Sequence, residues 1–169
     1  MNTSREWLIQ WLRDVHAMEE QAETMLSGLH DRIENYPELR NRIRTHLDET
    51  RVQAERIRTC LASLGAGSSS LKDAAAKILA AAQSVSGAFG DDEVLKGCLA
   101  SYSFEHVEIA SYTMLSAAAE TCGEMGVVQV CQQNLREEVA MAEWMHNHLG
   151  SITKEFLTRA DAKLKDAKR

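Results

Sequence analysis

Helix-breaking residues are sparse in this chain of 169 residues, and their positions constrain the fold more than any other feature. Pro37 is the only proline, and the other breaks are "GAGSSS" at 65–70, "SGAFGDD" at 86–92 and Gly123. Proline cannot continue a helix and glycine weakens one, whereas the segments between the breaks are rich in alanine and aliphatic residues. The spacing therefore predicts helices over 4–34, 37–64, 71–86, 91–121 and 124–149, and a last helical stretch after Gly150, where the chain is expected to kink or break.

Four of these predicted helices are long, and the connections between them differ in length. Short links join the first pair and the last pair, so each pair should form an antiparallel hairpin. The long connection lies between the two hairpins and contains the predicted short helix at 71–86. A four-helix bundle with one long crossover is the ferritin-like arrangement. We therefore expect an all-α protein with a single ferritin-like helical-bundle domain over residues 1–169.

Charge and composition argue against several classes of partner. The net charge is −6 and the isoelectric point is about 5.5, so a nucleic-acid partner is not expected on electrostatic grounds. No apolar run approaches the length of a membrane span, and the first residues lack the basic and apolar regions of a signal peptide. The four cysteines form no C-x-x-C pair and sit among apolar neighbours, as expected for buried thiols in a reducing compartment. We therefore expect a cytoplasmic protein without a membrane partner.

Each long helix carries an apolar stripe at helical spacing, and each stripe is interrupted by a residue type that binds metals. In the first helix, for example, the stripe runs from Trp11 to Leu29. An α-helix turns about 100° per residue, so the residues on one face can be identified from their spacing. The interrupting residues, inside a stripe or at its edge, are Glu19, His46, Glu49, Glu105, Glu108 and Glu138.

These residues have two physical interpretations. A buried carboxylate protonates, forms an ion pair or binds a metal, and several together also repel one another. Two divalent cations would neutralise such a cluster, and carboxylates with imidazole suit iron or manganese, while zinc fits the same donors. Alternatively, the edge residues reach solvent, His46 is a hydrogen-bonded core histidine, and Glu105 or Glu138 pairs with Arg56 or Arg136. Spacing alone leaves both interpretations open.

Four segments of the chain carry recognisable motifs: "DVHAMEEQ" at 14–21, "HLDETRVQAERI" at 46–57, "FEHVEIASY" at 104–112 and "NLREEVAMAEWM" at 134–145. Within them, the strings H-L-x-E-T-x-x-Q and E-H-x-E-I-A-x-Y are fairly specific. Over nearly its whole length the chain resembles the YciF/YciE family of bacterial ferritin-like stress proteins. The resemblance implies a ferritin-like bundle, a diiron-type site contributed by all four helices, and a role in stress responses.

The resemblance also implies roles for individual residues. The six interrupting residues become the candidate ligands of two divalent ions, with iron as the expected metal. Tyr102, Tyr112 and Gln53 are expected to orient the carboxylates by hydrogen bonds. His106 lies on the flank of its helix, where it is expected to contact a neighbouring helix or to act as an outer donor.

The chain also departs from the usual pattern of ferritin-like diiron proteins, which carry Glu-x-x-His on the second and fourth helices. Here Val52 and Met141 occupy the positions of those histidines, and the second helix reads His46-x-x-Glu49, in reverse order. Two functions therefore stay open. One is a stress protein that handles iron or peroxide at a dinuclear site. The other is a non-catalytic stress protein that acts by self-association or partner binding and keeps a vestigial site.

Large apolar side chains at the stripe margins bear on assembly. Trp7, Trp11 and Trp144 lie on long amphipathic helices together with several methionines. Such residues serve either the core or an interface between chains. Together with the resemblance, they lead us to expect a homodimer.

Overall fold

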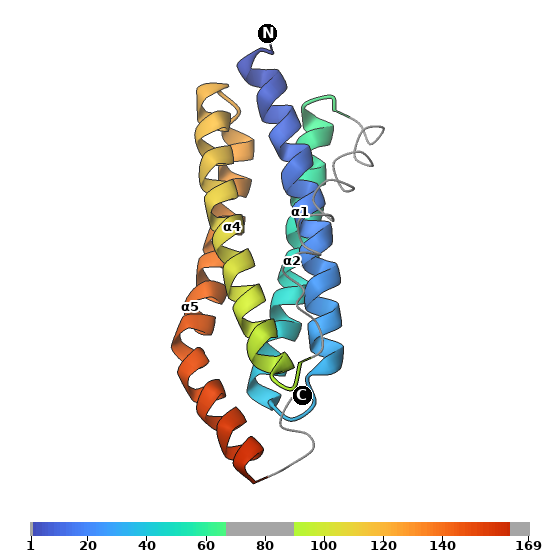
Figure 1. Ribbon diagram of the computed structural model, residues 1–169. Coiled ribbons are helices and arrows are strands. Elements are labelled where there is room, and N and C mark those ends of the chain that lie inside the picture. Colours follow the sequence, from blue (N-terminus) through green and yellow to red (C-terminus); the bar gives the residue numbers. More distant parts are fainter. Residues whose placement is uncertain (1, 67–89, 163–169) are drawn as a thin grey trace.

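The computed structural model describes residues 2–66 and 90–162, and within these ranges its only regular secondary structure is α-helix. Four long helices run along one common axis (Figure 1). This confirms the all-α four-helix bundle that the breaks in the sequence predict. The predicted short helix at 71–86 falls outside the described residues. The bounds of the helices are α1 Ser4–Arg32, α2 Pro37–Ser63, α4 Glu93–Thr121 and α5 Met125–Asp161.

The helix ends follow local rules of capping. The hydroxyl of Thr3 accepts a hydrogen bond from the backbone N–H of Glu6, whose side chain accepts one from the backbone N–H of Thr3. This capping box puts the N-cap at Thr3, one residue before the helix start expected from sequence. Pro37 occupies the first turn of α2, where its missing N–H has no consequence. Gly123 adopts a φ of 74° between α4 and α5, a conformation that glycine reaches without strain.

The helices pack as two hairpins. α1 packs against α2 and α4 against α5, while α1 also contacts α4 and α2 contacts α5. α5 is the longest, with 37 residues, and its C-terminal part extends past the other helices (Figure 1). It continues through Gly150 without a break, so the expected interruption there is wrong. A single glycine costs a helix only about 1 kcal/mol, which the contacts of its neighbours offset.

Two apolar clusters make up the core, one toward each end of the bundle. Leu12, Ile57 and Leu115 belong to the first cluster, whereas Leu26 and Met141 belong to the second. Each fully buried aliphatic side chain contributes about 1.5–3 kcal/mol relative to exposure, so the two clusters supply most of the stabilisation. The residues between the clusters on each helix form a polar layer, and this layer contains Glu19, His46, Thr50, Gln53, Glu105, Glu108, Asn134 and Glu138.

The position of Trp11 differs from the one expected from the apolar stripe of α1. Trp11 is 37% exposed and packs beside Trp7 at a ring-centroid distance of 5.9 Å, so it does not belong to the buried stripe of α1. Leu8 and Leu12 fill the core there instead.

None of the helices in the described ranges has an apolar stretch long enough to span a bilayer. The four cysteines are free thiols, and all but Cys122 are buried.

Candidate metal centre

Four side chains of the polar layer converge on one point. His46 comes from α2, Glu105 and Glu108 from α4, and Glu138 from α5. Each offers one ligand atom, and these atoms all lie within 4.8 Å of one another. All four side chains are at most 1% exposed. The group could therefore hold a metal ion, and we call it the metal cluster.

Helical spacing explains why one helix supplies two of these groups. Glu105 and Glu108 are three residues apart, so they occupy the same face of α4 one turn apart. Ser101, one turn earlier on that face, donates a hydrogen bond of 3.3 Å to Glu105 Oε1. The inner face of α4 is thus polar for about two turns, and it is apolar on either side.

Within the metal cluster, His46 lies between its carboxylates and the partly exposed Glu49. Its Nε2 lies 3.0 Å from Glu105 Oε2 and 3.3 Å from Glu138 Oε2, distances of an ion pair, but neither contact has hydrogen-bond geometry. On the opposite side of the ring, Nδ1 donates to Glu49 Oε2 at 2.9 Å. Glu49 thereby fixes Nδ1 as the protonated nitrogen and directs Nε2 toward the cluster, as outer carboxylates do for metal-binding histidines.

Glu49 itself lies outside the group. It is 32% exposed, and its Oε2 also accepts a hydrogen bond of 3.2 Å from Arg42. Arg42 and His46 together lower the pKa of Glu49, against the effect of partial burial. The structure therefore places this predicted ligand behind His46, in position to orient the ring.

Burial and mutual repulsion dominate the electrostatics of the cluster. Burial raises the pKa of Glu108 well above its ordinary value, and the charges of Glu138, Glu19 and Glu105 raise it further. Burial also raises the pKa of Glu105 to about 7, although His46 acts in the opposite direction. For His46, burial acts to lower the pKa, but the carboxylates of Glu105, Glu138 and Glu49 outweigh it and raise the pKa well above the usual range.

Glu19 of α1 is fully buried beside this group. Burial raises its pKa well above the ordinary value, the charge of Glu138 adds to the increase, and a hydrogen bond from Tyr112 opposes it. Tyr112 donates that bond to Glu19 Oε1, while Oε2 has no partner. Glu19 is thus coupled to the cluster, although its oxygens do not belong to the set of four convergent ligand atoms.

The chemistry of the donors fits a cation. Buried polar atoms normally have hydrogen-bond partners, and exceptions call for an explanation. The carboxylate oxygens cannot donate to one another when ionised, and among residues 2–66 and 90–162 no cationic side chain other than His46 forms an ion pair with Glu105, Glu108 or Glu138. Within the described ranges, the atoms of this region without a partner are Glu19 Oε2, His46 Nε2, Glu105 Oε2, Glu108 Oε1 and both oxygens of Glu138. Divalent cations would provide the missing partners of these acceptors.

The suggested arginine pairings do not form. Arg56 pairs with Glu137, at 2.7 Å, and not with Glu105. Gln53 also donates to Glu137, at 3.0 Å, so it does not orient a carboxylate of the cluster. Asn134 is a functional candidate that the sequence reasoning missed. It is fully buried and lies one helical turn before Glu138, a spacing that could have drawn attention to it.

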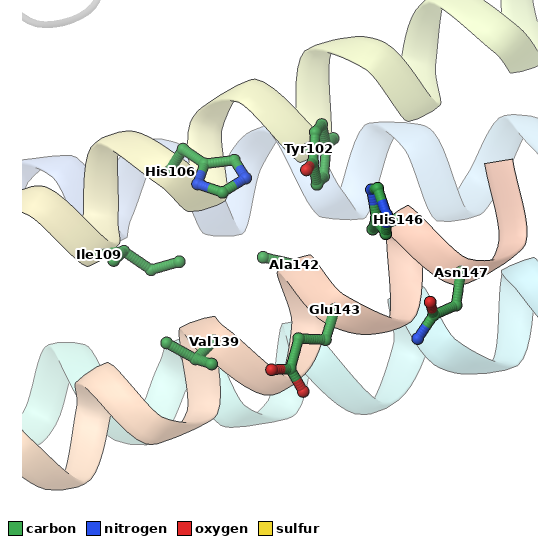
Figure 2. Close-up of a pocket in the computed structure, with 8 residues that line it drawn as sticks. All are labelled: Tyr102, His106, Ile109, Val139, Ala142, Glu143, His146 and Asn147. Atoms are coloured by element: carbon green, nitrogen blue, oxygen red, sulfur yellow. The ribbon is translucent and has the colours of Figure 1, made fainter.

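Tyr102 and His106 line a groove between α4 and α5, whose lining does not include the carboxylates of the metal cluster (Figure 2). The groove has a volume of about 560 Å³, and Glu143 and His146 line its other side. The ring of Tyr102 meets His106 edge to face at 4.7 Å and lies 6.2 Å from His146. His106 is exposed and lines the groove together with residues of α5, while its expected contact to a neighbouring helix stays a prediction.

Known proteins share both the sequence pattern and the fold. The family described as "Domain of unknown function (DUF892)" matches residues 3–158. A protein of Xanthomonas campestris with a crystal structure is 41% identical, with 94% of this chain and 99% of that chain covered and a TM-score of 0.80. The E. coli stress protein YciF is 28% identical over 88% of this chain and 96% of its own, with a TM-score of 0.71. YcfI of Rhodopseudomonas palustris, described as a proposed structural protein, is 27% identical over 86% and 94%, with a TM-score of 0.71.

Proposed function

The chain belongs to the DUF892 family, and on that premise we propose that it is a ferritin-like stress-response protein that holds two divalent ions of the iron type in its polar layer. One observation carries the proposal: four buried ligand atoms from three helices lie within 4.8 Å of one another, and each of the three carboxylates has at least one oxygen without a hydrogen-bond partner. A stress role is supported by the similarity to the E. coli stress protein YciF. The proposed location is the cytoplasm.

The number and kind of ions follow from charge and donor chemistry. Glu19, Glu105, Glu108 and Glu138 would carry four negative charges when ionised, and two dications would balance them. Carboxylates with one imidazole suit iron and manganese, and zinc also accepts these donors. Glu19 would serve the second ion through its unpartnered Oε2.

The protein residues would provide binding, orientation and exclusion of water. Bound iron would supply one-electron redox chemistry toward peroxide or further ferrous iron. The apolar clusters on both sides of the polar layer keep bulk water away from the ligands, which strengthens every electrostatic interaction there. Glu49, held by Arg42, keeps the His46 ring turned so that Nε2 faces the cluster. We assign no catalytic residue.

Metal analysis tests this proposal directly. We expect the protein purified from cells grown with added iron to contain about two ions per chain, because six buried acceptor atoms lack other partners. The measurement is elemental analysis of the protein after gel filtration without chelator. A variant with His46→Ala and Glu105→Ala serves as the control and should retain little metal. Wild type with no more metal than this variant would contradict the proposal.

A second candidate function, self-association without catalysis, is favoured by the outer face of α4. Between Lys96 and Glu120 the only carboxylates on α4 are Glu105 and Glu108, both buried, and α4 has no lysine or arginine there. Leu99, Val107 and Met114 are exposed on the opposite face, by 61%, 54% and 63%. Large apolar side chains exposed together on one face of a helix mark a surface for contact with another protein chain.

A second copy of the chain is the occupant we propose for this face. The chain carries a net charge of −6, so an uncharged face is the surface on which two copies meet with the least repulsion. A symmetric dimer pairs such a face with itself. The description of YcfI as a proposed structural protein is in keeping with a role of this kind.

Val107→Glu should dissociate this homodimer. In a symmetric interface the new carboxylate occurs twice, and both copies lose water in contact with apolar side chains. The measurement is light scattering at micromolar concentration. Val52→Glu, at a 48% exposed valine of α2, is the matched control and should leave the dimer intact. A monomeric wild type, or a Val107→Glu variant that stays dimeric, would rule out this interface.

A further inference from the structure

A series of hydrogen bonds connects all four helices and ends at Glu19, beside the metal cluster. Arg56 of α2 donates from Nη1 to Asn134 Oδ1 of α5 at 2.9 Å. Asn134 Nδ2 donates to the hydroxyl of Tyr112 on α4 at 2.9 Å, and Tyr112 donates to Glu19 Oε1 on α1. Glu19, Tyr112 and Asn134 are fully buried, whereas Arg56 is 22% exposed and also pairs with Glu137.

Arg56 determines which group donates and which accepts in each of these hydrogen bonds. A guanidinium has donors and no acceptor, so the oxygen of the Asn134 amide must face Arg56. The amide nitrogen must then face Tyr112 and donate to its hydroxyl oxygen. A hydroxyl has a single proton, and because its oxygen already accepts from Asn134, that proton is available for Glu19. No reversed arrangement satisfies all four groups.

This polarity decides which oxygen of Glu19 remains available. Tyr112 occupies Oε1, whereas Oε2 is buried without a hydrogen-bond partner. We propose that Arg56 and Asn134 act through Tyr112 as positioning residues, holding Glu19 so that it binds a divalent cation through Oε2 alone. This inference rests on the proposed metal-binding function and adds to it three residues, none of which touches the ion.

Asn134→Asp separates this role from simple electrostatics. Aspartate has nearly the shape of asparagine but no donor, so Tyr112 can donate to residue 134 instead of Glu19. Added negative charge alone would strengthen cation binding. Loss of the oriented hydrogen bond should instead weaken it by about 10-fold or more, as the loss of outer-sphere partners does elsewhere. Asn134→Asp is therefore predicted to weaken cation binding, whereas the added negative charge alone would strengthen it.

The measurement is titration of chelator-treated protein with Co²⁺, followed by its visible absorption, which reports both affinity and ligand geometry. Gln133→Glu adds the same charge at an exposed position of α5 and should bind Co²⁺ as tightly as wild type or more tightly. Tyr112→Phe, which keeps the ring and loses the hydroxyl, should weaken binding as Asn134→Asp does. Unchanged or tighter binding by either of these two variants, provided that it is folded, would overturn the proposal.

A second measurement on the metal-free protein keeps the inference separate from the metal hypothesis. The hydroxyl proton of a buried, hydrogen-bonded tyrosine is observable by NMR, and its nuclear Overhauser contacts identify the acceptor. In wild type we expect contacts from the Tyr112 hydroxyl proton to the Glu19 side chain, and in Asn134→Asp contacts to residue 134. Wild type that binds no Co²⁺ but shows this switch would refute the metal function and leave the hydrogen-bond polarity established. Absence of the contact to Glu19 in wild type would refute the polarity itself.

Discussion

Glu138→Gln should leave the metal-free protein as stable as wild type or more stable, and should remove most of the stabilisation that ferrous iron provides. In the metal-free protein Glu138 has two buried oxygens without hydrogen bonds, and its charge raises the pKa of Glu19, Glu105 and Glu108. A glutamine amide removes that repulsion and can donate to a neighbouring carboxylate. In the metal-bound protein the same change removes a ligand.

The expected size of the effect follows from mass action. A ligand that binds only the folded state stabilises it by about 4 kcal/mol when present at 1,000 times its dissociation constant. For a chain of this length that corresponds to a rise in melting temperature of roughly 8–16 °C. The measurement is thermal unfolding of wild type and variant, each with chelator and with anaerobic ferrous iron. We expect iron to raise the melting temperature of wild type by this amount and that of Glu138→Gln only slightly.

Glu143→Gln provides the control for this experiment. Glu143 lies on the same helix but is exposed in the groove of Figure 2, so its replacement should leave both the metal-free stability and the iron-dependent rise unchanged. If Glu138 serves only a structural network, its loss should destabilise the protein equally with and without iron. That outcome, together with a wild type that shows no shift with iron, would exclude a metal site at this position.

The metal-free protein should also lose stability as the pH rises from 5.5 to 8.5. Glu19, Glu105 and Glu108 all have raised pKa values in the folded state, and so does His46. A group of this kind stabilises the fold fully below its unfolded-state pKa, and that stability is lost as the pH rises through its folded-state pKa. The four groups therefore act in the same direction.

The pKa shift of Glu105 gives an approximate size for this loss of stability. Its pKa rises from 4.5 to about 7, which corresponds to on the order of 3 kcal/mol, lost mostly between pH 4.5 and 7. Exposed acids such as Glu6 and Glu55 have lowered pKa values and titrate below this window. Urea unfolding at several pH values with chelator measures the effect. Glu108→Gln should show a shallower decline, and a wild type as stable at pH 8.5 as at pH 5.5 would contradict the prediction.

Periodicity and chain breaks were sufficient to predict the bundle, because both report backbone geometry directly. Pro37 and Gly123 separate the helices of the two hairpins, because proline cannot continue a preceding helix and glycine reaches the positive φ of the turn without strain. The same periodicity predicted the burial of His46, Glu105, Glu108 and Glu138, since each occupies a position on or near an apolar stripe. Their convergence agrees with the sequence prediction, whereas their role as ligands stays a prediction.

Side-chain contacts and burial that depend on neighbouring residues could not be predicted from the residue spacing within a single helix. Glu49 has the spacing of a ligand, but Arg42 and His46 hold it on the far side of the imidazole. Asn134 looks like an ordinary polar residue until Tyr112 and Arg56 are placed beside it. Trp11 fits the α1 stripe by spacing, yet it lies on the surface because Leu8 and Leu12 fill the core.

Anomalous scattering at the iron absorption edge is the most direct test of the metal site. Crystals grown from protein loaded with ferrous iron should show a strong anomalous peak between His46 Nε2 and the carboxylates of Glu105, Glu108 and Glu138. A second peak should lie toward Glu19 Oε2. Data collected below the edge should show both peaks much reduced, which identifies the metal as iron. A well-ordered crystal of iron-loaded protein with no anomalous peak among these side chains would contradict the central claim that the polar layer is a metal site.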